Sequence, residues 1–379
     1  MRIAFTVLSA LLLLAACGSQ QEETVTETDS PDTLELAVTD TIGVLMGDST
    51  LMFGSISWAE HHPDGNILIL DGMKSQISVF SPDLELEAVH GRHGSGPGEF
   101  QYPRYFAVLS NGNIAVSDWG AHTVTILNPD FTYLETVEGF YPIAPAEIVP
   151  GAMEGYVGGG MDLLPSDSEA GFDGSTYVGL WLNESEPVVR YESFPLDVTV
   201  ESNGEETDVN VDNVDGVFDT DPFGNVYVAI RSDSTYTINR YTPEGELDLT
   251  IDREWERIEK TEEELQREIL IESHSRSDEG GSSTNTRQEL DLYPWHNAIS
   301  VITTDENGYL WVGQGYTSYP VFRVFDPTGE LVRIVSIPDL DGVYGLDYSF
   351  RHGLLAYDYA PEDYPKVYLL EPIGGEVLP

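Results

Sequence analysis

Short runs of alternating apolar and polar residues, each bounded by turn residues, recur along the chain from about residue 33. In the clearest example, Tyr105–Leu109 is followed by a turn at Asn111–Asn113, a second run at Ile114–Ser117 and a third at Thr123–Leu127, which ends at a turn starting with Asn128. Such alternation between Gly, Asn and Pro turns predicts β-strands joined by tight hairpins. One antiparallel sheet of this kind cannot bury both of its faces, so the pattern indicates a repeated unit.

The turns themselves repeat along the chain. Their glycines are separated by intervals of 47, 112, 84 and 45 residues, at Gly65, Gly112, Gly224, Gly308 and Gly353. The interval of 112 residues holds an extra, irregular unit near residues 153–192, and the interval of 84 residues holds one unit and an insertion. A period in the forties is typical of β-propellers. The sequence therefore predicts an all-β fold, a six-bladed β-propeller.

A glycine-rich connector makes this prediction more specific. The segment Gly94–Phe100 (GSGPGEF) precedes a strand, a Gly112-Asn113 turn and a second strand that ends in Asp118. This arrangement resembles an NHL repeat, and the chain from about residue 33 resembles the bacterial six-bladed β-propeller lipoproteins. The Asp-x-x-Asn-x-Arg pattern that follows the second strand of NHL repeats is absent from the corresponding segments, Asp71–Gln76 and Asp118–Thr123. The resemblance therefore implies a fold and leaves the function open.

The N-terminus carries a targeting pattern. Residues 1–17 contain one Arg followed by an apolar run that is too short to span a bilayer as a stable helix. The run ends in Leu14–Cys17 (LAAC), which resembles a lipobox, and Cys17 is the only cysteine. We therefore predict a lipoprotein signal peptide at 1–17, a lipid on Cys17 and a disordered acidic tether at 18–32. Gly rather than Asp after the cysteine resembles outer-membrane sorting, so the predicted location is the cell envelope, lipid-anchored, on the periplasmic or the exposed side.

The predicted propeller spans residues 33–379 and is interrupted at 252–291, between blades four and five. Within this insertion, Thr261 begins a capping box, and four apolar residues follow helical spacing: Trp255, Ile258, Leu265 and Ile269. We therefore expect a helical and low-complexity insertion in this position. It either forms a flap over the mouth of the propeller or decorates the surface.

The chain is strongly acidic, with 66 Asp and Glu against 17 Lys and Arg and a net charge of −49. A field of this sign repels nucleic acid and anionic lipid headgroups. We therefore expect no nucleic-acid partner, contact with the membrane through the lipid anchor alone, and a monomer.

Motifs for known chemistry are scarce. The sequence contains no Gly-x-Ser-x-Gly, His-Glu-x-x-His, P-loop or CxxC pattern. Three histidines, His93, His122 and His296, are predicted on one face of the ring, where they would either bind a divalent metal or be unrelated surface residues.

We call this face the mouth: it carries the loops between second and third strands and the connectors between blades. Aromatic, basic and acidic residues concentrate in these segments, and the predicted ligand-binding residues are Asp71, Lys74, Tyr102, Arg104, Asp118, Trp119, His122, Arg231, Trp295 and His296. Stacking rings with a few cations would suit a sugar, a peptide or a small anion. In the alternative interpretation, the aromatic residues pack between the blades.

Three functions agree with these observations. The absence of catalytic motifs favours a lipid-anchored envelope propeller that binds a small ligand or a protein partner at its mouth without catalysis. The second is a metal-dependent lyase or lactone hydrolase, as in propeller enzymes that this fold resembles. The third is a scaffold subunit of an envelope complex. The predicted partners are accordingly a small molecule, a glycan, a peptide or an envelope protein.

Overall fold

The structure of the protein is a computed structural model that describes residues 31–165, 172–196, 198–202, 207–211, 216–269, 294–314, 317–359 and 363–375. The compact unit begins at Asp32. The predicted signal peptide, the lipidated Cys17 and most of the tether lie outside the described residues, as do residues 270–291 of the insertion. No helix in the described ranges is long and apolar enough to cross a bilayer.

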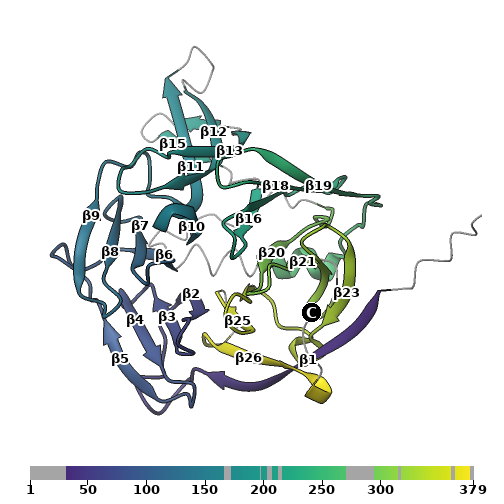
Figure 1. Ribbon diagram of the computed structural model, residues 1–379, viewed down its shortest axis with the longest axis horizontal. Helices are drawn as coiled ribbons and strands as arrows, with labels where there is room; N and C mark the ends of the chain where they lie inside the picture. Colours follow the sequence, from purple (N-terminus) through teal and green to yellow (C-terminus); the bar gives the residue numbers. More distant parts are fainter. Residues whose placement is uncertain are drawn as a thin grey trace, which may run out of the picture. The chain divides into compact units, whose positions relative to one another are not determined.

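Sheets arranged in a ring form the unit (Figure 1), so the chain has the propeller arrangement that the sequence predicts. Four of the described sheets have four antiparallel strands each, in sequence order from the inside of the ring to the outside. The first sheet consists of β2 (Ile56–His61), β3 (Ile67–Asp71), β4 (Gln76–Phe80) and β5 (Leu86–His90), and the second of β6 (Pro103–Val108), β7 (Ile114–Asp118), β8 (Thr123–Leu127) and β9 (Tyr133–Val137). The third sheet consists of β10 (Ala146–Pro150), β11 (Tyr156–Pro165), β12 (Phe172–Trp181) and β13 (Val189–Leu196), and the fourth of β16 (Gly216–Thr220), β17 (Val226–Ile230), β18 (Tyr236–Tyr241) and β19 (Leu247–Arg253).

The predicted turns are confirmed by the backbone. The turn glycines Gly65, Gly112, Gly224 and Gly308 all have φ between 83° and 92°, the left-handed region that glycine enters without a steric penalty. In the turns at Gly224 and Gly308 a preceding aspartate also fixes the backbone. Asp221 Oδ1 accepts hydrogen bonds from the N–H groups of residues 223 and 225, both at 2.9 Å, and Asp305 Oδ1 accepts from those of residues 307 and 309 at 2.9 and 3.0 Å. The repeated glycines therefore mark the hairpins between first and second strands.

Not all of the six predicted blades form sheets of their own, because the rest of the ring is one eight-stranded sheet. Its order is β20 (Val301–Thr304), β21 (Leu310–Gln314), β22 (Val321–Phe325), β23 (Leu331–Ser336), β1 (Asp32–Ile42), β26 (Val367–Pro372), β25 (Leu355–Asp358) and β24 (Leu346–Ser349). The first part of β1 runs parallel to β23, with Glu35 opposite Ser336, and the second part runs antiparallel to β26, with Val38 opposite Leu370. The parallel pairing with β23 fuses what would be two sheets into one.

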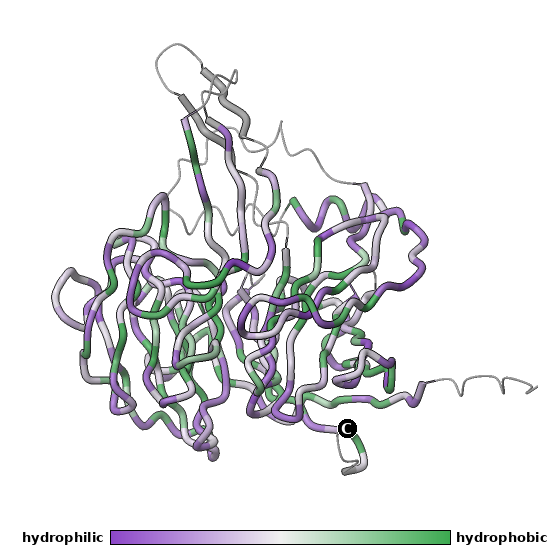
Figure 2. The backbone as a smooth tube through the Cα atoms, turned by 45° about the horizontal axis from the view of Figure 1, so that its top comes forward, coloured by the Kyte–Doolittle hydropathy of each residue, from purple (hydrophilic) through white to green (hydrophobic). Residues whose placement is uncertain are grey.

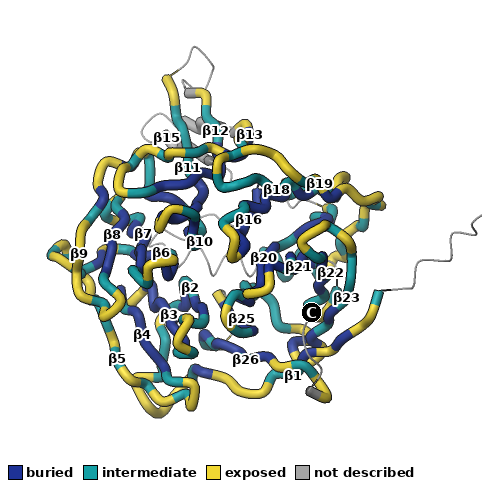
Figure 3. The backbone as a smooth tube through the Cα atoms, viewed as in Figure 1, coloured by how far each residue is buried: buried dark blue, intermediate teal, exposed yellow. Residues whose placement is uncertain are grey.

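The hydrophobic core lies between neighbouring sheets. One cluster, for example, joins Ile69 and Phe80 to Tyr357, which belongs to the eight-stranded sheet. Another joins Leu70 to Phe106 and Val116 of the next sheet. Figure 3 shows buried residues along the inner strands and exposed residues at the loops and along the outer strands. Each sheet thus buries both faces only because it has a neighbour on each side, as the repeat implies.

The third sheet departs from the regular unit. Strands β11 and β12 have ten residues each, whereas β3, β7 and β17 have five. The hairpin that they form extends beyond the inner strand β10 and rises above the other sheets (Figure 2). A separate two-stranded sheet, β14 (Val198–Ser202) and β15 (Thr207–Val211), follows it in the chain.

The predicted insertion contains a helix at residues 262–269. The capping box at its start is present: the N–H of Glu264 donates to Thr261 Oγ1 at 3.3 Å, and the N–H of Thr261 donates to Glu264 Oε2 at 2.6 Å. The guanidinium of Arg267 lies 3.8 Å from the ring centre of Tyr344, in the connector before β24. The helix therefore reaches from the β19–β20 connection to the mouth side of the eight-stranded sheet, while its role as a flap stays a prediction.

A charged network lies at the opposite end of the inner strands, on the turn side. Arg351 follows β24, and its Nη2 donates to Asp219 Oδ1 of β16 at 2.7 Å and to Thr220 Oγ1 at 3.2 Å. Asp219 also accepts the N–H of Thr304 of β20 at 2.7 Å. Burial raises the pKa of Glu60, on β2, to about 7, although the Arg351 guanidinium opposes this shift. The Arg351 guanidinium therefore interacts with the buried carboxylates of Asp219 and Glu60, which belong to two other sheets.

Candidate functional site

The inner strands position a group of polar and aromatic side chains on the mouth side of the ring. Successive inner strands contact one another around the ring, from β2 through β6, β10, β16, β20 and β24 back to β2. Each inner strand begins on the mouth side. We define the mouth-side cluster as the residues near these beginnings together with one from β25: Trp58, Tyr105, Glu147, Asp347 and Tyr357.

β-Bulges place three of these residues. The strand register shifts between Ile56 and Trp58, between Pro103 and Tyr105, and around Glu147, in each case where the inner strand pairs with the second strand of its sheet. A bulge inserts an extra residue and changes the direction of the side chains beside it, and such irregularities are frequent at functional sites. Glu147 also has φ of 50°, a strained value for a residue other than glycine. A β-bulge near the start of the inner strand therefore recurs in three sheets.

Aromatic rings connect the cluster from one sheet to the next. The ring centres of Trp119 and Tyr105 are 5.8 Å apart, those of Tyr105 and Trp58 are 5.5 Å apart, and those of Trp58 and Tyr357 are 6.0 Å apart. These are ordinary edge-to-face and tilted contacts. Together they form a continuous aromatic wall across three sheets of the ring.

Arg104 lies against this wall. Its guanidinium is 5.6 Å from the ring centre of Trp119 and 5.4 Å from that of Tyr102, and its Nη1 donates to the Tyr102 hydroxyl at 2.8 Å. Burial raises the pKa of Tyr105, and the neighbouring Arg104 opposes that rise. The sequence predicted Tyr102, Arg104 and Trp119 in the site, and the structure brings these three together beside the cluster.

The two carboxylates of the cluster interact with an arginine outside it, Arg231. The Tyr357 hydroxyl donates to Asp347 Oδ2 at 3.2 Å. Burial raises the pKa of Asp347, and it also raises the pKa of Glu147; Arg231 lowers both, and the charge of Asp347 adds to the rise at Glu147. Glu147, Asp347 and Arg231 are therefore close enough to influence one another, and their formal charges sum to a net negative site. Tyr359, 44% exposed, interacts electrostatically with the same three groups.

Sequence reasoning found Arg231 but missed Glu147 and Asp347. Both are single acidic residues within short inner strands, and no motif distinguishes them from the many other acidic residues of this chain. The one signal was local: Glu147 interrupts an otherwise apolar stretch, Ile143–Val149, which is otherwise expected to be buried.

Two of the predicted aspartates have their carboxylates occupied by the backbone. Asp118 accepts hydrogen bonds from the N–H groups of residues 101, 102 and 121 at 2.6, 2.8 and 3.1 Å. Asp71 occupies the same position of the preceding sheet and accepts from residues 54, 55 and 74 at 2.8, 3.3 and 3.1 Å. Both side chains hold the connector that enters their sheet against the end of the second strand. Lys74 belongs to the same structure, because its Nζ lies 3.6 Å from Asp71 Oδ2 and donates to the Met52 carbonyl.

The remaining predicted residues lie apart from the cluster. His122 is an exposed turn residue with φ of 55°. His296 is 7% exposed, and its Nε2 lies 3.3 Å from Glu264 Oε1 of the insertion helix. Trp295 packs under the guanidinium of Arg257, 5.4 Å from its ring centre. The described ranges hold no group of three or more His, Cys, Asp or Glu side chains that could bind a metal, so His93, His122 and His296 do not form one.

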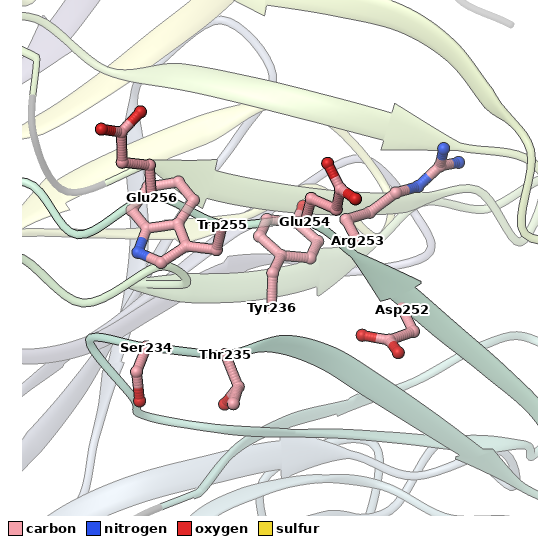
Figure 4. Close-up of a pocket in the computed structure, with 8 residues that line it drawn as sticks. All are labelled: Ser234, Thr235, Tyr236, Asp252, Arg253, Glu254, Trp255 and Glu256. Atoms are coloured by element: carbon pink, nitrogen blue, oxygen red, sulfur yellow. The ribbon is translucent and has the colours of Figure 1, made fainter.

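A depression of about 640 Å³ also lies on the mouth face, at the start of β18 and the end of β19 (Figure 4). Its lining includes the side chains of Tyr236 and Trp255, whose ring centres are 6.3 Å apart, and the carboxylates of Asp252, Glu254 and Glu256. None of its lining residues belongs to the mouth-side cluster. It is an acidic surface hollow on the outside of its sheet.

Comparisons with known proteins give no family. No protein-family model matches the chain, and no curated protein matches it. Among solved structures, a member of the DUF4221 family from Bacteroides vulgatus is 9% identical, with 90% of this chain and 99% of that chain covered and a TM-score of 0.49. Virginiamycin B lyase from Staphylococcus aureus is 10% identical over 88% and 99% of the two chains, with a TM-score of 0.42. Regucalcin, a calcium-binding protein from Agrobacterium tumefaciens, is 9% identical over 92% and 98%, with a TM-score of 0.40. The propeller arrangement therefore rests on this chain's own strand pairing.

Proposed function

We propose that this chain is a binding propeller of the cell envelope that takes a small organic cation at its mouth-side cluster, without catalysis. The observation that carries the proposal is the pairing of two carboxylates of raised pKa, Glu147 and Asp347, with a wall of aromatic rings. Carboxylates and ring faces both attract cations, and the attraction is stronger where water is partly excluded. The net charge of −49 draws the same class of ligand toward the protein.

We further infer that the ring counts six blades and is of the NHL type. The eight-stranded sheet divides at β1 into β20–β23 and β24–β26 with β1. The unbroken circle of contacts among the inner strands supports this count, because each of the six inner strands then starts one blade. The glycine-rich connector Gly94–Phe100 supports the NHL type.

Binding of an organic cation can be tested by isothermal titration calorimetry with benzylamine, using benzyl alcohol as the uncharged control. We expect benzylamine to bind and the alcohol not to. Affinity should increase as the pH rises from 5 to 8, since the cation needs carboxylates that have lost their protons and burial holds their pKa above the usual range. Benzylamine stays protonated across this range, so the carboxylates account for the change.

The matched variants are Glu147→Gln and Glu135→Gln. The first removes a charge from the cluster and should weaken binding about tenfold. The second removes the same charge from β9, where Glu135 is exposed, and should leave the affinity unchanged. Equal binding of the amine and the alcohol, or no effect of Glu147→Gln, would contradict the proposal. A stoichiometric divalent metal, detected by elemental analysis of the purified protein, would instead favour a metal-dependent lyase or lactone hydrolase.

The proposed envelope location depends on acylation of Cys17. Its support is the apolar run that ends in Leu14–Cys17. Intact mass spectrometry of the protein from its native membrane should give a chain that begins at a lipid-modified Cys17. A mature chain without lipid, beginning at any other residue, would refute the anchor.

A further inference from the structure

Strand β11 has a free edge along half of its length. Its first four residues, Tyr156–Gly159, pair with β10, whereas Gly160–Pro165 pair only with β12, from Gly160 opposite Tyr177 to Pro165 opposite Phe172. On the β10 side, no described strand pairs with this second half. In an antiparallel strand every second residue directs its N–H and C=O to one side, so this stretch presents a row of open backbone groups.

The sequence of this edge lacks the usual protection. Natural edge strands are commonly blocked by lysine, proline or a bulge. Residues 160–165 read GMDLLP, in which proline occupies the last position and lysine is absent. Leu164 is 64% exposed. The edge is therefore open to pairing with another extended segment.

A groove runs beside the edge. It has a volume of about 200 Å³ and lies between β11 and the connector from β9 to β10. Its lining comes from the connector, chiefly Phe140, Tyr141 and Ile143, and from β11, chiefly Met161, Leu163 and Leu164. Tyr141 is 73% exposed at the rim. A free edge next to a groove is the arrangement in which added strands are bound, since the backbone pairs with the edge and alternate side chains enter the groove.

The charge around the groove favours a basic partner. Glu186 lines the groove and is exposed. The other lining carboxylate, Asp162, is neutralised by Arg190, with Asp162 Oδ2 and Arg190 Nη1 2.5 Å apart. The rest of the chain adds a strong negative field.

We propose that the free edge of β11 binds an extended, cationic segment of another protein by β-strand addition. The segment pairs with Gly160–Leu164 and places alternate apolar side chains in the groove, while its Lys or Arg residues face the acidic surface. This site is distinct from the mouth-side cluster and does not depend on the cation-binding function proposed there. Outer strands such as β5 and β19 also end their sheets; the hollow of Figure 4 lies at the end of β19, whereas the groove described above runs alongside the free half of β11.

The probe for this site is a fluorescein-labelled peptide of about six residues in which valine and lysine alternate, a length that matches the free edge. Fluorescence anisotropy with the full chain should show binding. The same peptide with N-methyl groups on every second residue keeps its charge and loses strand N–H groups, so it should not bind. This comparison separates strand addition from simple attraction to an acidic protein.

The matched variants are Leu164→Lys and Leu247→Lys. Both replace an exposed leucine on a strand, but Leu164 is on the free edge and Leu247, 56% exposed, is on β19. Leu164→Lys should raise the dissociation constant at least about tenfold, and Leu247→Lys should leave it unchanged. Equal binding of the N-methylated peptide, no binding at about 1 mM, or equal effects of the two variants would overturn the proposal. So would analytical ultracentrifugation showing a dimer that Leu164→Lys converts to a monomer, because a second copy would then occupy the edge.

Discussion

Replacing Arg351 with Met should lower the free energy of unfolding by about 3–5 kcal/mol. The side chains of Arg351 and Asp219 are 13% and 8% exposed, and their ion pair at 2.7 Å is therefore largely desolvated. Methionine has a similar volume but no charge, so Asp219 would remain buried without its cation. Removing one partner of a buried ion pair destabilises the fold, because the remaining charge stays desolvated without a compensating interaction.

The loss of stability caused by Arg351→Met changes with pH in a defined direction. The pKa of Glu60 is already raised to about 7, so its folded form holds a proton that the unfolded form releases near pH 4.5. Folding stability therefore falls as the pH rises through this interval. Without Arg351 the pKa of Glu60 rises further, and the loss caused by Arg351→Met should be larger at pH 8 than at pH 5.

Urea denaturation at both pH values measures the effect. Arg92→Met provides the control, because Arg92 also pairs with a carboxylate, that of Glu99, but its side chain is 76% exposed. The control should leave the free energy of unfolding nearly unchanged. If the two variants unfold at the same urea concentration, the network on the turn side does not stabilise the ring.

A chain that starts at Gly43, and so lacks β1, should not form the cooperative ring. Strand β1 buries Leu34, Leu36 and Ile42, which are 5%, 0% and 3% exposed. Burial of three such side chains contributes about 5–9 kcal/mol, comparable with the whole stability of a typical domain. Removal of β1 would also leave β23 and β26 with open edges.

Circular dichroism melting and size-exclusion chromatography distinguish the outcomes. The chain that starts at Gly43 should melt without a sharp transition or elute as an aggregate. A chain that starts at Asp32 keeps all of β1 and should melt like the full chain, since the compact unit begins there. If both truncated chains melt alike, β1 is not required for closure of the ring.

Local residues made most of the fold predictable. The turn glycines mark the hairpins, because the ability to adopt a positive φ depends on the residue type and its immediate neighbours. The strand predicted at Thr123–Leu127 coincides with β8. The number of separate sheets could not be derived in the same way. It depends on whether Asp32–Glu35 pair with β23, and the partners in that pairing are about 300 positions apart, with no local pattern that selects them.

In the candidate site, too, residues that are close in the sequence could be grouped in advance, whereas residues from distant strands could not. Tyr102, Arg104 and Trp119 are near one another in the sequence, in one repeat, and the structure places their side chains in contact, while their role in ligand binding stays a prediction. Glu147 and Asp347 come from different sheets; burial raises the pKa of both, and the charge of Asp347 adds to the rise at Glu147. An environment of this kind exists only after the ring has closed, so the amino-acid sequence alone could not reveal it.

The pairing of β1 also determines when folding can finish. The N–H of Val38 donates to Asp339 Oδ2 at 3.0 Å, across 301 positions of sequence, and the other partners of β1 are equally remote. During synthesis the first strand therefore emerges long before anything that can pair with it. The ribosome must release most of the chain while its earliest apolar strand is still exposed, and contacts of such separation are slow to form. We therefore expect the pairing of β1 to be among the last steps of folding.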